Sequence, residues 1–301
     1  MRKKISFVLF TLLIFFTISC TKRSLQTKSS TEADKNLQAQ TLQEKSPDYP
    51  QRIVALSPSA GEILFAVGAE EQVAAVSEFT DYPPEAASKP VVGGFDGKTL
   101  SMESILGFKP DFLYLTDGMH NFLIEQLEAY KIPYYLSKGN SIAAVKLEIL
   151  DIGKITGHEA KAKEIVSEME KKLSAVKGGS SSDSTSSRKL YYEVWNAPFM
   201  TAGARSFIND IIFTSGAQNI FADIDEAYPI VSEETIIARQ PEYILIPASC
   251  GITLEAVKAR NGWASIPAVK NNRIFLIDDN VYTRPGPRVA DVVVELNSLL
   301  Q

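Results

Sequence analysis

The stretch that decides the fold is TGHEAKAKEIVSEMEKKLSAVK, residues 156–177. Thr156 and Glu159 have the spacing of a capping box, which predicts that a helix begins there. Gly178 and Gly179 predict its end. About 20 helical residues, at roughly 1.5 Å each, make a helix of about 30 Å, long enough to connect two lobes. Apolar residues recur along it at steps of four, four and three, which indicates one apolar stripe: Ile165, Met169, Leu173 and Val176.

The sequence repeats itself on either side of this helix. Residues 101–115 read SMESILGFKPDFLYL, and residues 232–246 read SEETIIARQPEYILI. Each copy predicts a Ser-capped short helix, a turn made by a Pro-acid pair, and a buried strand. The aligned pairs are Ser101 with Ser232, Glu103 with Glu234, Ile105 with Ile236, Pro110 with Pro241, Asp111 with Glu242, and Phe112 with Tyr243.

A second pair of segments is related more loosely. Residues 52–69 (RIVALSPSAGEILFAVGA) and residues 189–217 both read as strand, loop, helix and a Gly-Ala stop. In the first of them Ser59 and Glu62 again have capping-box spacing. The simplest fold that fits both repeats is an α/β fold of two similar lobes joined by one long helix, and chance similarity between two β-α units is the alternative.

The N-terminal segment has the features of an export signal. Three basic residues, 2–4, precede an apolar run at residues 5–18, which is too short to span a bilayer comfortably and is typical of a secretory signal. Ser19 before Cys20 resembles the cleavage box of a bacterial lipoprotein, in which the Cys becomes the acylated first residue, although Thr17 stands where the box prefers Leu. The alternative is ordinary signal cleavage, with Cys20 incidental.

The composition of the chain after Cys20 divides it into segments. A polar stretch poor in large apolar residues predicts a disordered tether, and a Ser-rich stretch after the connecting helix predicts a low-complexity loop. The predicted segments are a lipoprotein signal peptide at 1–19, the tether at 20–50, an N-terminal α/β lobe at 51–155, the inter-lobe helix at 156–177, the loop at 178–187, and a C-terminal α/β lobe at 188–301.

Charge and cysteine content limit the partners. The formal net charge is −5, and removal of the three basic residues near the N-terminus would make it −8, which argues against a nucleic-acid partner. Cys20 and Cys250 are the only cysteines. If Cys20 carries lipid, Cys250 has no partner within the chain, so no disulfide is expected and Cys250 is interpreted as a small buried residue at a strand end.

Catalytic and metal-binding patterns are weak. The two histidines, His120 and His158, are too few for a closed zinc or manganese site, so no metal ligand is assigned. His120 follows the predicted strand at 112–115, where it either forms hydrogen bonds within a loop or meets a haem iron or a cobalt. No acid-base pair or phosphate loop is evident, so an enzyme is a weaker alternative. A receptor that signals without transport is another.

Several motifs together resemble one known family, the cobalamin and iron-siderophore class of ABC-transporter substrate-binding proteins, and within it the cobalamin-binding branch most closely. The resemblance extends from Arg52 to Leu300. The motifs that carry it are RIVALSPSAGEILFAVGA at 52–69, DYPPEA at 81–86, VGGF at 92–95, LSMESILGFKPDFL at 100–113, TAGARSFINDII at 201–212, YPIVSEETIIARQPEYILI at 228–246 and YTRPGPR at 282–288.

The resemblance implies that the connecting helix joins the lobes and that a ligand binds in the cleft between them. It also implies that Glu103 and Glu234, one on each lobe, dock onto a permease dimer that works with an ATPase. Each cleft aromatic, taken alone, could equally be a packing residue. The positions that match cleft residues of the family are Phe79, Phe95, Trp195, Phe199, Tyr228 and Arg284, and Tyr82 is predicted as a further ligand contact because it is an aromatic residue in a loop between strands.

The nature of these residues suggests the ligand. A flat corrin ring binds aromatic and aliphatic surfaces, with a few polar groups at its edge. Arg284 could instead bind a siderophore carboxylate or a haem propionate. We therefore expect an exported, monomeric substrate-binding protein with no cofactor of its own, anchored by lipid to a bacterial membrane on either its periplasmic or its outer cell-surface side. Its expected ligand is a corrinoid, and a ferric siderophore or haem is the alternative.

Overall fold

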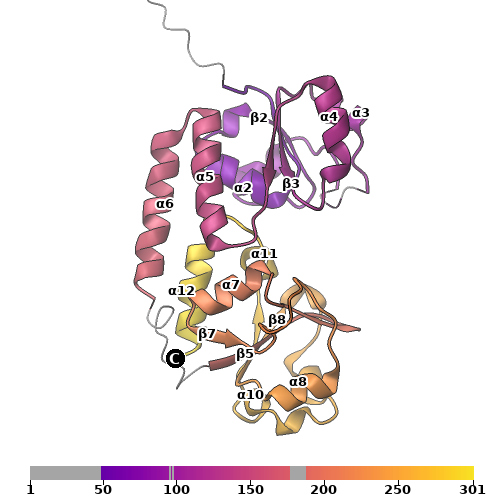
Figure 1. The fold of residues 1–301 in the computed structure, drawn as a ribbon, viewed down its shortest axis with the longest axis vertical. Coiled ribbons are helices and arrows are strands. Elements are labelled where there is room, and N and C mark those ends of the chain that lie inside the picture. Colours follow the sequence, from indigo (N-terminus) through magenta and orange to yellow (C-terminus); the bar gives the residue numbers. More distant parts are fainter. Residues whose placement is uncertain (1–48, 95, 97, 177–187) are drawn as a thin grey trace, which may run out of the picture. The chain divides into compact units, whose positions relative to one another are not determined.

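The structure is a computed structural model that describes residues 49–94, 96, 98–176 and 188–301 (Figure 1). The predicted signal peptide, the predicted loop at 178–187 and all but the last two residues of the predicted tether lie outside the described residues. Residues Tyr49–Gln301 form a single unit. We call the elements from β1 to α5 the first lobe and those from β5 to α12 the second lobe.

The first lobe is built on a four-stranded parallel sheet in the order β2-β1-β3-β4. Its strands are β1 (Ile53–Ala55), β2 (Val73–Val76), β3 (Phe112–Thr116) and β4 (Tyr134–Ser137). Its α-helices are α2 (Pro58–Ala66), α3 (Met102–Gly107), α4 (Ile124–Tyr130) and α5 (Ile142–Thr156). Short 3-10 turns cover Glu70–Gln72, Pro84–Ser88 and Asn121–Leu123. Parallel strands joined through helices bury both faces of the sheet, which explains why β1 and most of β3 are wholly apolar and buried.

The second lobe repeats this plan around β5. The strands β7 and β8 pair with β5 in parallel, β9 pairs with β8 in parallel, and β6 pairs with the far end of β5 antiparallel. The strands are β5 (Arg188–Asn196), β6 (Phe199–Thr201), β7 (Ala217–Asn219), β8 (Tyr243–Pro247) and β9 (Ile274–Ile277). The α-helices are α7 (Phe207–Thr214), α8 (Glu233–Arg239), α9 (Leu254–Lys258), α10 (Pro267–Lys270), α11 (Asp279–Tyr282) and α12 (Val289–Leu299), and 3-10 turns cover Ala248–Cys250 and Trp263–Ser265.

The strand register confirms the internal repeat. In the first sheet Ile53 lies opposite Phe112, and in the second sheet Leu190 lies opposite Tyr243. These pairs occupy matching positions in the two copies predicted from the sequence. The two lobes therefore share one β-α-β plan, in agreement with the expected α/β fold.

Helix caps and turns repeat as well. The side chains of Ser101 and Ser232 accept hydrogen bonds from the backbone N–H three residues later, so each caps its helix as predicted. Lys109 and Gln240, which precede the two aligned prolines, both have a φ of 50°. A non-glycine residue in the left-handed region is uncommon, so the same turn at equivalent places supports a real duplication.

The bounds predicted for the connecting helix are wrong. Thr156 is the last residue of α5, and its hydroxyl donates to the carbonyl of Ile152 at 2.7 Å instead of capping a new helix. Gly157 follows with a φ of 83° and ends α5. The next helix, α6 (Glu159–Ser174), begins after His158, which makes no side-chain capping bond. The capping-box spacing therefore spans a turn between two helices, and α6 stops before the predicted glycines.

The helix α6 nevertheless connects the two lobes. It packs against α5 of the first lobe and against α12 of the second (Figure 1). Gly153 of α5 allows the close approach, because a Cβ at that position would lie 2.3 Å from the Cβ of Ala162. On the α12 side, Lys172 forms an ion pair with Asp291 at 2.5 Å. Such exposed pairs contribute about 0–1 kcal/mol each, so apolar packing makes the main connection.

One hydrophobic cluster runs through both lobes. It includes Ile53 and Ile152 of the first lobe, Met169 of α6, and Phe207 and Leu296 of the second lobe. Two further clusters are local, one in each lobe. The lobes therefore share a continuous core along the side covered by α5, α6 and α12. Among the described residues, no helix combines the length and the apolar character needed to cross a membrane.

Candidate ligand-binding site

The helix after β1 carries a buried carboxylate. Ser57 caps α2 by accepting from the N–H of Ala60 at 3.2 Å, so the predicted capping box of Ser59 with Glu62 is wrong. Pro58 occupies the first helical turn and moves the cap back to Ser57. Glu62 is only 2% exposed. Its carboxylate is thereby left to accept a partner from another part of the chain.

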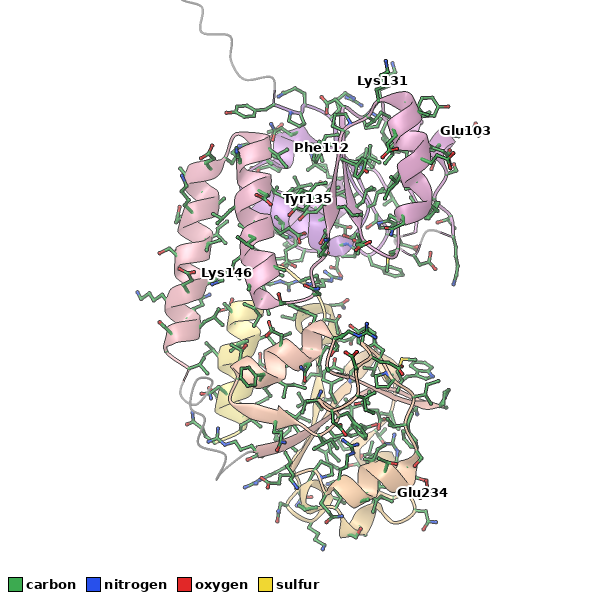
Figure 2. The ribbon with its side chains drawn as sticks, viewed as in Figure 1. Glu103, Phe112, Lys131, Tyr135, Lys146 and Glu234 are labelled. Atoms are coloured by element: carbon green, nitrogen blue, oxygen red, sulfur yellow. The ribbon has the colours of Figure 1, made fainter. Side chains whose placement is uncertain are left out.

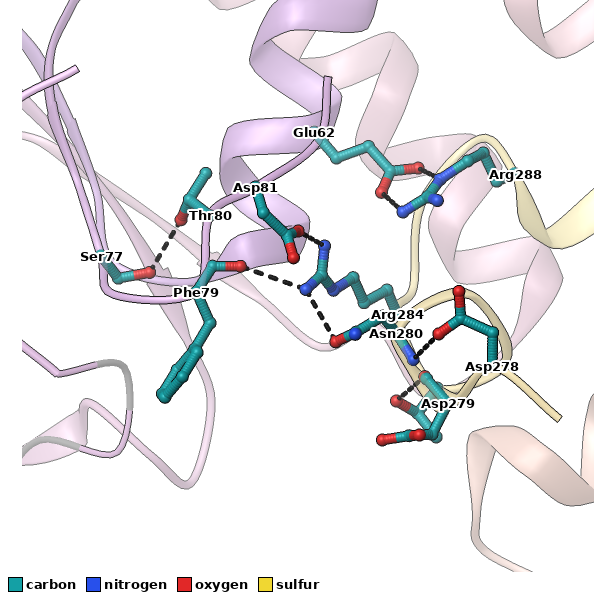
Figure 3. A network of polar contacts seen from close by, with 11 residues as sticks. Glu62, Ser77, Phe79, Thr80, Asp81, Asp278, Asp279, Asn280, Arg284 and Arg288 are labelled. Atoms are coloured by element: carbon teal, nitrogen blue, oxygen red, sulfur yellow. Dashed lines mark hydrogen bonds and ion pairs between the residues drawn. The ribbon is translucent and has the colours of Figure 1, made fainter. Parts of the chain in front are cut away.

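That partner comes from the C-terminal RPGPR motif, which docks on the first lobe. Arg288 donates from Nε and Nη2 to the two oxygens of Glu62, at 2.9 and 2.6 Å (Figure 3). A Cβ on Gly286 would lie 2.9 Å from Glu62 Oε1, so the backbone itself rests on the carboxylate. The ring of Pro285 fits against Gly139, where a Cβ would lie 2.8 Å from it. The motif thus fastens the end of the second lobe to α2 and to the loop after β4.

Arg284, the first arginine of the same motif, donates hydrogen bonds to three acceptors. Its Nη1 donates to Asp81 Oδ1 at 2.6 Å, and its Nη2 donates to the carbonyl of Phe79 at 3.1 Å and to Asn280 Oδ1 at 3.0 Å (Figure 3). The Arg284 side chain is 9% exposed. Its hydrogen bond to Asp81 lowers the pKa of that carboxyl. The guanidinium of Arg284 therefore donates its hydrogen bonds to groups of the protein itself, two of which belong to the loop of residues 77–84.

Two predicted aromatic residues of the first lobe stand on that loop. The ring of Phe79 is 60% exposed and points away from the Arg284 guanidinium, while its carbonyl faces that group (Figure 3). Tyr82 is 40% exposed, and the guanidinium carbon of Arg288 lies 3.8 Å from the centre of its ring. The third predicted aromatic, Phe95, lies outside the described residues.

The second lobe presents its aromatic residues on a small antiparallel ribbon. Trp195 of β5 lies opposite Met200 of β6, which in turn lies opposite Ile230. Cross-strand partners share a face, so these three side chains form one apolar row. Trp195 and Tyr228 are 49% and 47% exposed, and Ile230 is also exposed. The contributions of Met200 and Ile230 were missed from the sequence, because only the strand register puts them beside Trp195.

Phe199 lies on the opposite face of the ribbon. Its ring is tilted against that of Trp263 at 6.1 Å, and the guanidinium of Arg260 lies 5.1 Å from it. Arg260 also donates to both oxygens of the fully buried Glu193, at 2.6 and 2.7 Å. The structure thus places Phe199 in the packing of the second lobe, where it supports the ribbon, and not beside the other predicted contacts.

The short helix α11 connects the aromatic residues of the two lobes. On one side Asn280 holds Arg284, and on the other Asp279 accepts from the N–H of Ser249 at 3.3 Å. Burial, followed by the negative charge of Asp279 and the proximity of Tyr228, raises the pKa of Tyr192 well above its usual value. The loop of residues 77–84 is therefore linked to α11 through Arg284, and the turn after β8 is linked to α11 directly through Ser249.

The histidines and Cys250 have local partners. His120 is fully buried, and its Nδ1 accepts from the N–H of Thr116 at 2.9 Å, so the structure shows the hydrogen-bonding alternative. His158 Nδ1 lies 3.2 Å from Thr156 Oγ1. Cys250 is partly buried just after β8, with Sγ 3.7 Å from the Val194 carbonyl, and burial raises the pKa of its thiol. The described residues contain no group of three His, Cys, Asp or Glu side chains placed to hold a metal ion.

The two predicted docking acids are exposed at equivalent positions. Glu103 stands in the first turn of α3 and Glu234 in the first turn of α8, both on the side of the molecule away from α6 (Figure 2). Hydrogen bonds from its own N–H and from Ser232 lower the pKa of Glu234. The neighbouring Glu233 instead accepts from the indole N–H of Trp263 at 2.7 Å. Of this acidic pair, only Glu234 is left to contact a partner.

A surface hollow lies apart from all these residues. Ala175, Val176, Arg188 and Val294 are among the residues that line it, at the end of α6 and beside α12. None of the predicted ligand contacts that the structure describes lines this hollow, so it is not the proposed site.

Known proteins resemble this chain along most of its length. The model of a family described as periplasmic binding protein matches residues 53–281. A vitamin B12-binding protein of Vibrio parahaemolyticus is 26% identical over 248 residues, which cover 82% of this chain and 88% of that protein. An uncharacterized ABC transporter substrate-binding lipoprotein of Bacillus subtilis is 29% identical over 253 residues, 82% of this chain and 79% of that protein. The solved structure of a possible iron-binding, periplasmic solute-binding protein from Staphylococcus epidermidis matches with a TM-score of 0.69 at 30% identity, over 83% of this chain and 98% of that one.

Proposed function

This chain belongs to the periplasmic binding protein family, and on that premise we propose that it captures a corrinoid and delivers it to the permease of an ABC importer. The relatives support both halves of the proposal, since one is named for binding vitamin B12 and another for serving an ABC transporter. Substrate capture and delivery, without chemical change of the ligand, is the activity that we assign.

One observation carries the choice of ligand. Four of the aromatic side chains predicted as ligand contacts are 40–60% exposed, two on each lobe: Phe79, Tyr82, Trp195 and Tyr228. A monomeric protein gains little from leaving large aromatic surfaces in water, and exposed apolar clusters mark binding sites. A corrin is wide, flat and largely apolar on its faces, so it would bury several such rings at once.

The charges near these rings favour a corrinoid over haem or a ferric siderophore. Haem propionates and siderophore carboxylates are anionic and bind best to a guanidinium with free donors. Arg284 is paired with Asp81, and Arg288 with Glu62, so either arginine would have to leave a carboxylate to meet such a ligand. The amide rim of a corrinoid is neutral and needs no such exchange. The relative from Staphylococcus epidermidis, described as a possible iron-binding protein, supports an iron-containing ligand as the second candidate.

Fluorescence tests the corrinoid directly. The chain has two tryptophans, of which Trp263 is fully buried and Trp195 is half exposed. Because a corrin absorbs where tryptophan emits, cyanocobalamin bound on the ribbon should quench the emission of Trp195. Trp263 packs against Phe199 of the ribbon, so energy transfer to the corrin quenches it as well, and the quantity to compare is the cyanocobalamin concentration at half-maximal quenching. Trp195→Ala should raise that concentration about tenfold, because it removes one stacked aromatic ring. An unchanged concentration in Trp195→Ala would remove the ribbon from the proposed site.

We also propose that Cys20 carries the lipid anchor. It follows the predicted signal peptide, and the Bacillus subtilis relative is named a lipoprotein. Two or more acyl chains on one residue hold a protein stably on a membrane face. Cys20→Ala should therefore move the protein from the membrane fraction to the soluble fraction of the producing cells. Retention of the variant in salt-washed membranes would contradict the anchor.

Delivery to the transporter is assigned to Glu103 and Glu234. Each stands at the same place in its lobe, so the pair can present one carboxylate to each half of a two-fold permease. Exposed charge pairs of this kind determine orientation and association rate more than affinity.

A further inference from the structure

The backbone at Phe79 is unusual for an exposed aromatic residue. Its φ is 63°, in the left-handed region that L-residues other than glycine rarely adopt. That conformation is unfavourable for a residue with a Cβ, because it brings the Cβ close to the following carbonyl oxygen. Contacts elsewhere must therefore hold Phe79 in place, because nothing in a bulky aromatic side chain favours this geometry by itself.

The backbone of Phe79 is held through its carbonyl by Arg284. Arg284 donates to this oxygen at 3.1 Å and is itself fixed by Asp81 at 2.6 Å and Asn280 at 3.0 Å. The hydroxyls of Ser77 and Thr80, 3.1 Å apart, close the turn from the other side (Figure 3). The guanidinium thus fastens both Phe79 and Asp81 of the same loop, at a point where the ring of Phe79 projects outward.

Arg288, the second arginine of the RPGPR motif, makes a comparable contact with Tyr82, the second exposed aromatic residue of the loop. Arg288 is fixed by Glu62, and its guanidinium carbon lies 3.8 Å from the centre of the Tyr82 ring. Each arginine therefore has a carboxylate partner and one exposed aromatic residue of the loop. Since the motif follows the last strand of the second sheet, a segment of the second lobe determines how the first lobe presents its two rings.

We propose that Arg284 is a positioning residue that acts on the ligand only through Phe79. It holds the Phe79 carbonyl so that the backbone stays left-handed and the ring faces the ligand, and it does not contact the ligand itself. The inference rests on the proposed function, because it takes Phe79 as a ligand contact. It departs from a direct charge role for Arg284, because a side chain that is 9% exposed and has three acceptors within the protein leaves little surface for a ligand.

A double-mutant cycle with cyanocobalamin, measured by calorimetry, separates the two roles. Arg284→Ala and Phe79→Ala should each weaken binding about tenfold, and the double variant should bind no more weakly than Phe79→Ala alone. If Arg284 contacts the ligand directly, the two losses multiply to about a hundredfold, which would overturn the proposal. An unchanged affinity in Arg284→Ala would overturn it as well.

A conservative variant sharpens the comparison. Arg284→Lys keeps the positive charge but lacks the planar fork that reaches Asp81 and the Phe79 carbonyl together. A positioning role predicts that Arg284→Lys binds cyanocobalamin as weakly as Arg284→Ala. Wild-type affinity in Arg284→Lys would show that charge alone matters, and would contradict the proposal.

A measurement without ligand tests the positioning itself. In hydrogen exchange of the free protein, Arg284→Ala should speed exchange of the amides at residues 77–82 at least tenfold and leave the strands of both sheets protected. Arg52→Ala is the matched control, because Arg52 also donates to the carbonyl of a left-handed residue, Lys109, at 3.1 Å on another loop. It should leave residues 77–82 unchanged.

The binding measurement and the hydrogen-exchange measurement can contradict the proposed function and the positioning role independently. If the wild type does not bind cyanocobalamin but residues 77–82 loosen in Arg284→Ala, the proposed ligand is wrong and the positioning contact stands. If binding is tight and residues 77–82 exchange as in the wild type, the positioning proposal is wrong and the proposed function stands.

Discussion

Arg288 and Glu62 lie 226 residues apart in the sequence and form two parallel hydrogen bonds, of 2.9 and 2.6 Å. Glu62 is buried in the first lobe, and Arg288 arrives at the start of α12, after the last strand of the second sheet. With Arg284 and Asp81, this pair fastens the C-terminal segment across the lobes. The same contacts lie directly beneath the exposed rings of Phe79 and Tyr82.

Loss of either partner of this pair should be costly, because it leaves a largely buried charge without compensation. Arg288→Ala is expected to lower the free energy of unfolding by about 3–5 kcal/mol, measured in urea. The control is Lys163→Ala, which breaks the exposed pair with Glu159 and should cost less than about 0.5 kcal/mol. Equal effects of the two substitutions would show that the buried pair has no special role in stability.

Substitutions at Phe79 should rank by their tolerance of a left-handed backbone. Phe79→Gly is expected to be more stable than Phe79→Ala by about 0.5–1 kcal/mol, since glycine adopts a φ of 63° without steric cost. Phe79→Val should be the least stable of the three, because a branched Cβ is the worst fit for that region. Urea midpoints give the order, and a reversed order would mean that the loop does not keep this backbone in solution.

Much of the fold was predictable because its signals are local. The Ser caps and Pro-acid turns of the repeat act within a few residues, so Ser101 and Ser232 were assigned correctly. The start of the connecting helix was assigned wrongly. Gly157 ends α5 between Thr156 and Glu159, two residues whose spacing is typical of the start of a helix. Here two local signals competed, and the left-handed C-cap prevailed over the Thr156–Glu159 spacing.

The site was less predictable because its partners are distant in sequence. The exposed aromatic positions followed from family resemblance, but Arg284 could not be assigned to Asp81, 203 residues away, without the fold. The same holds for the row of Trp195, Met200 and Ile230, which depends on strand register. Residue type indicates what a side chain can bind, whereas the fold decides whether an internal partner has already taken it.

A buried acid in the first lobe predicts an unusual response to pH. Glu148 accepts from Ser137 at 2.8 Å and from Tyr114, yet burial raises its pKa above the usual 4.5. A raised pKa means that its contribution to stability is complete below about pH 4.5 and is lost as the pH rises through the folded-state value. Glu148→Gln should therefore lose less stability than the wild type as the pH rises above about 4.5.

The measurement for Glu148 is the urea midpoint of the wild type and of Glu148→Gln at a series of pH values. The difference between wild type and Glu148→Gln should change with pH, since other titrating groups cancel. Parallel profiles for the two proteins would show that Glu148 titrates normally in the folded state.

Charge reversal tests the docking surface. The double variant Glu103→Lys, Glu234→Lys should keep the thermal stability and ligand affinity of the wild type, because both side chains are exposed and take no part in the core. In vesicles that contain the permease and ATPase it should abolish uptake and ligand-stimulated ATP hydrolysis. Glu128→Lys with Glu255→Lys, at two other exposed helix positions, is the matched control. Full transport by the docking variant would show that the two acids serve only their helices.

Calorimetry of the purified mature protein with cyanocobalamin, haem and a ferric siderophore tests the central claim most directly. The account predicts that cyanocobalamin binds at one site with a Kd of about 1 µM or tighter, which corresponds to about −8 kcal/mol. It predicts that the two anionic ligands bind at least about a hundredfold more weakly, because Arg284 and Arg288 already hold carboxylates. Tight binding of haem or of the siderophore, with no heat from cyanocobalamin, would contradict it.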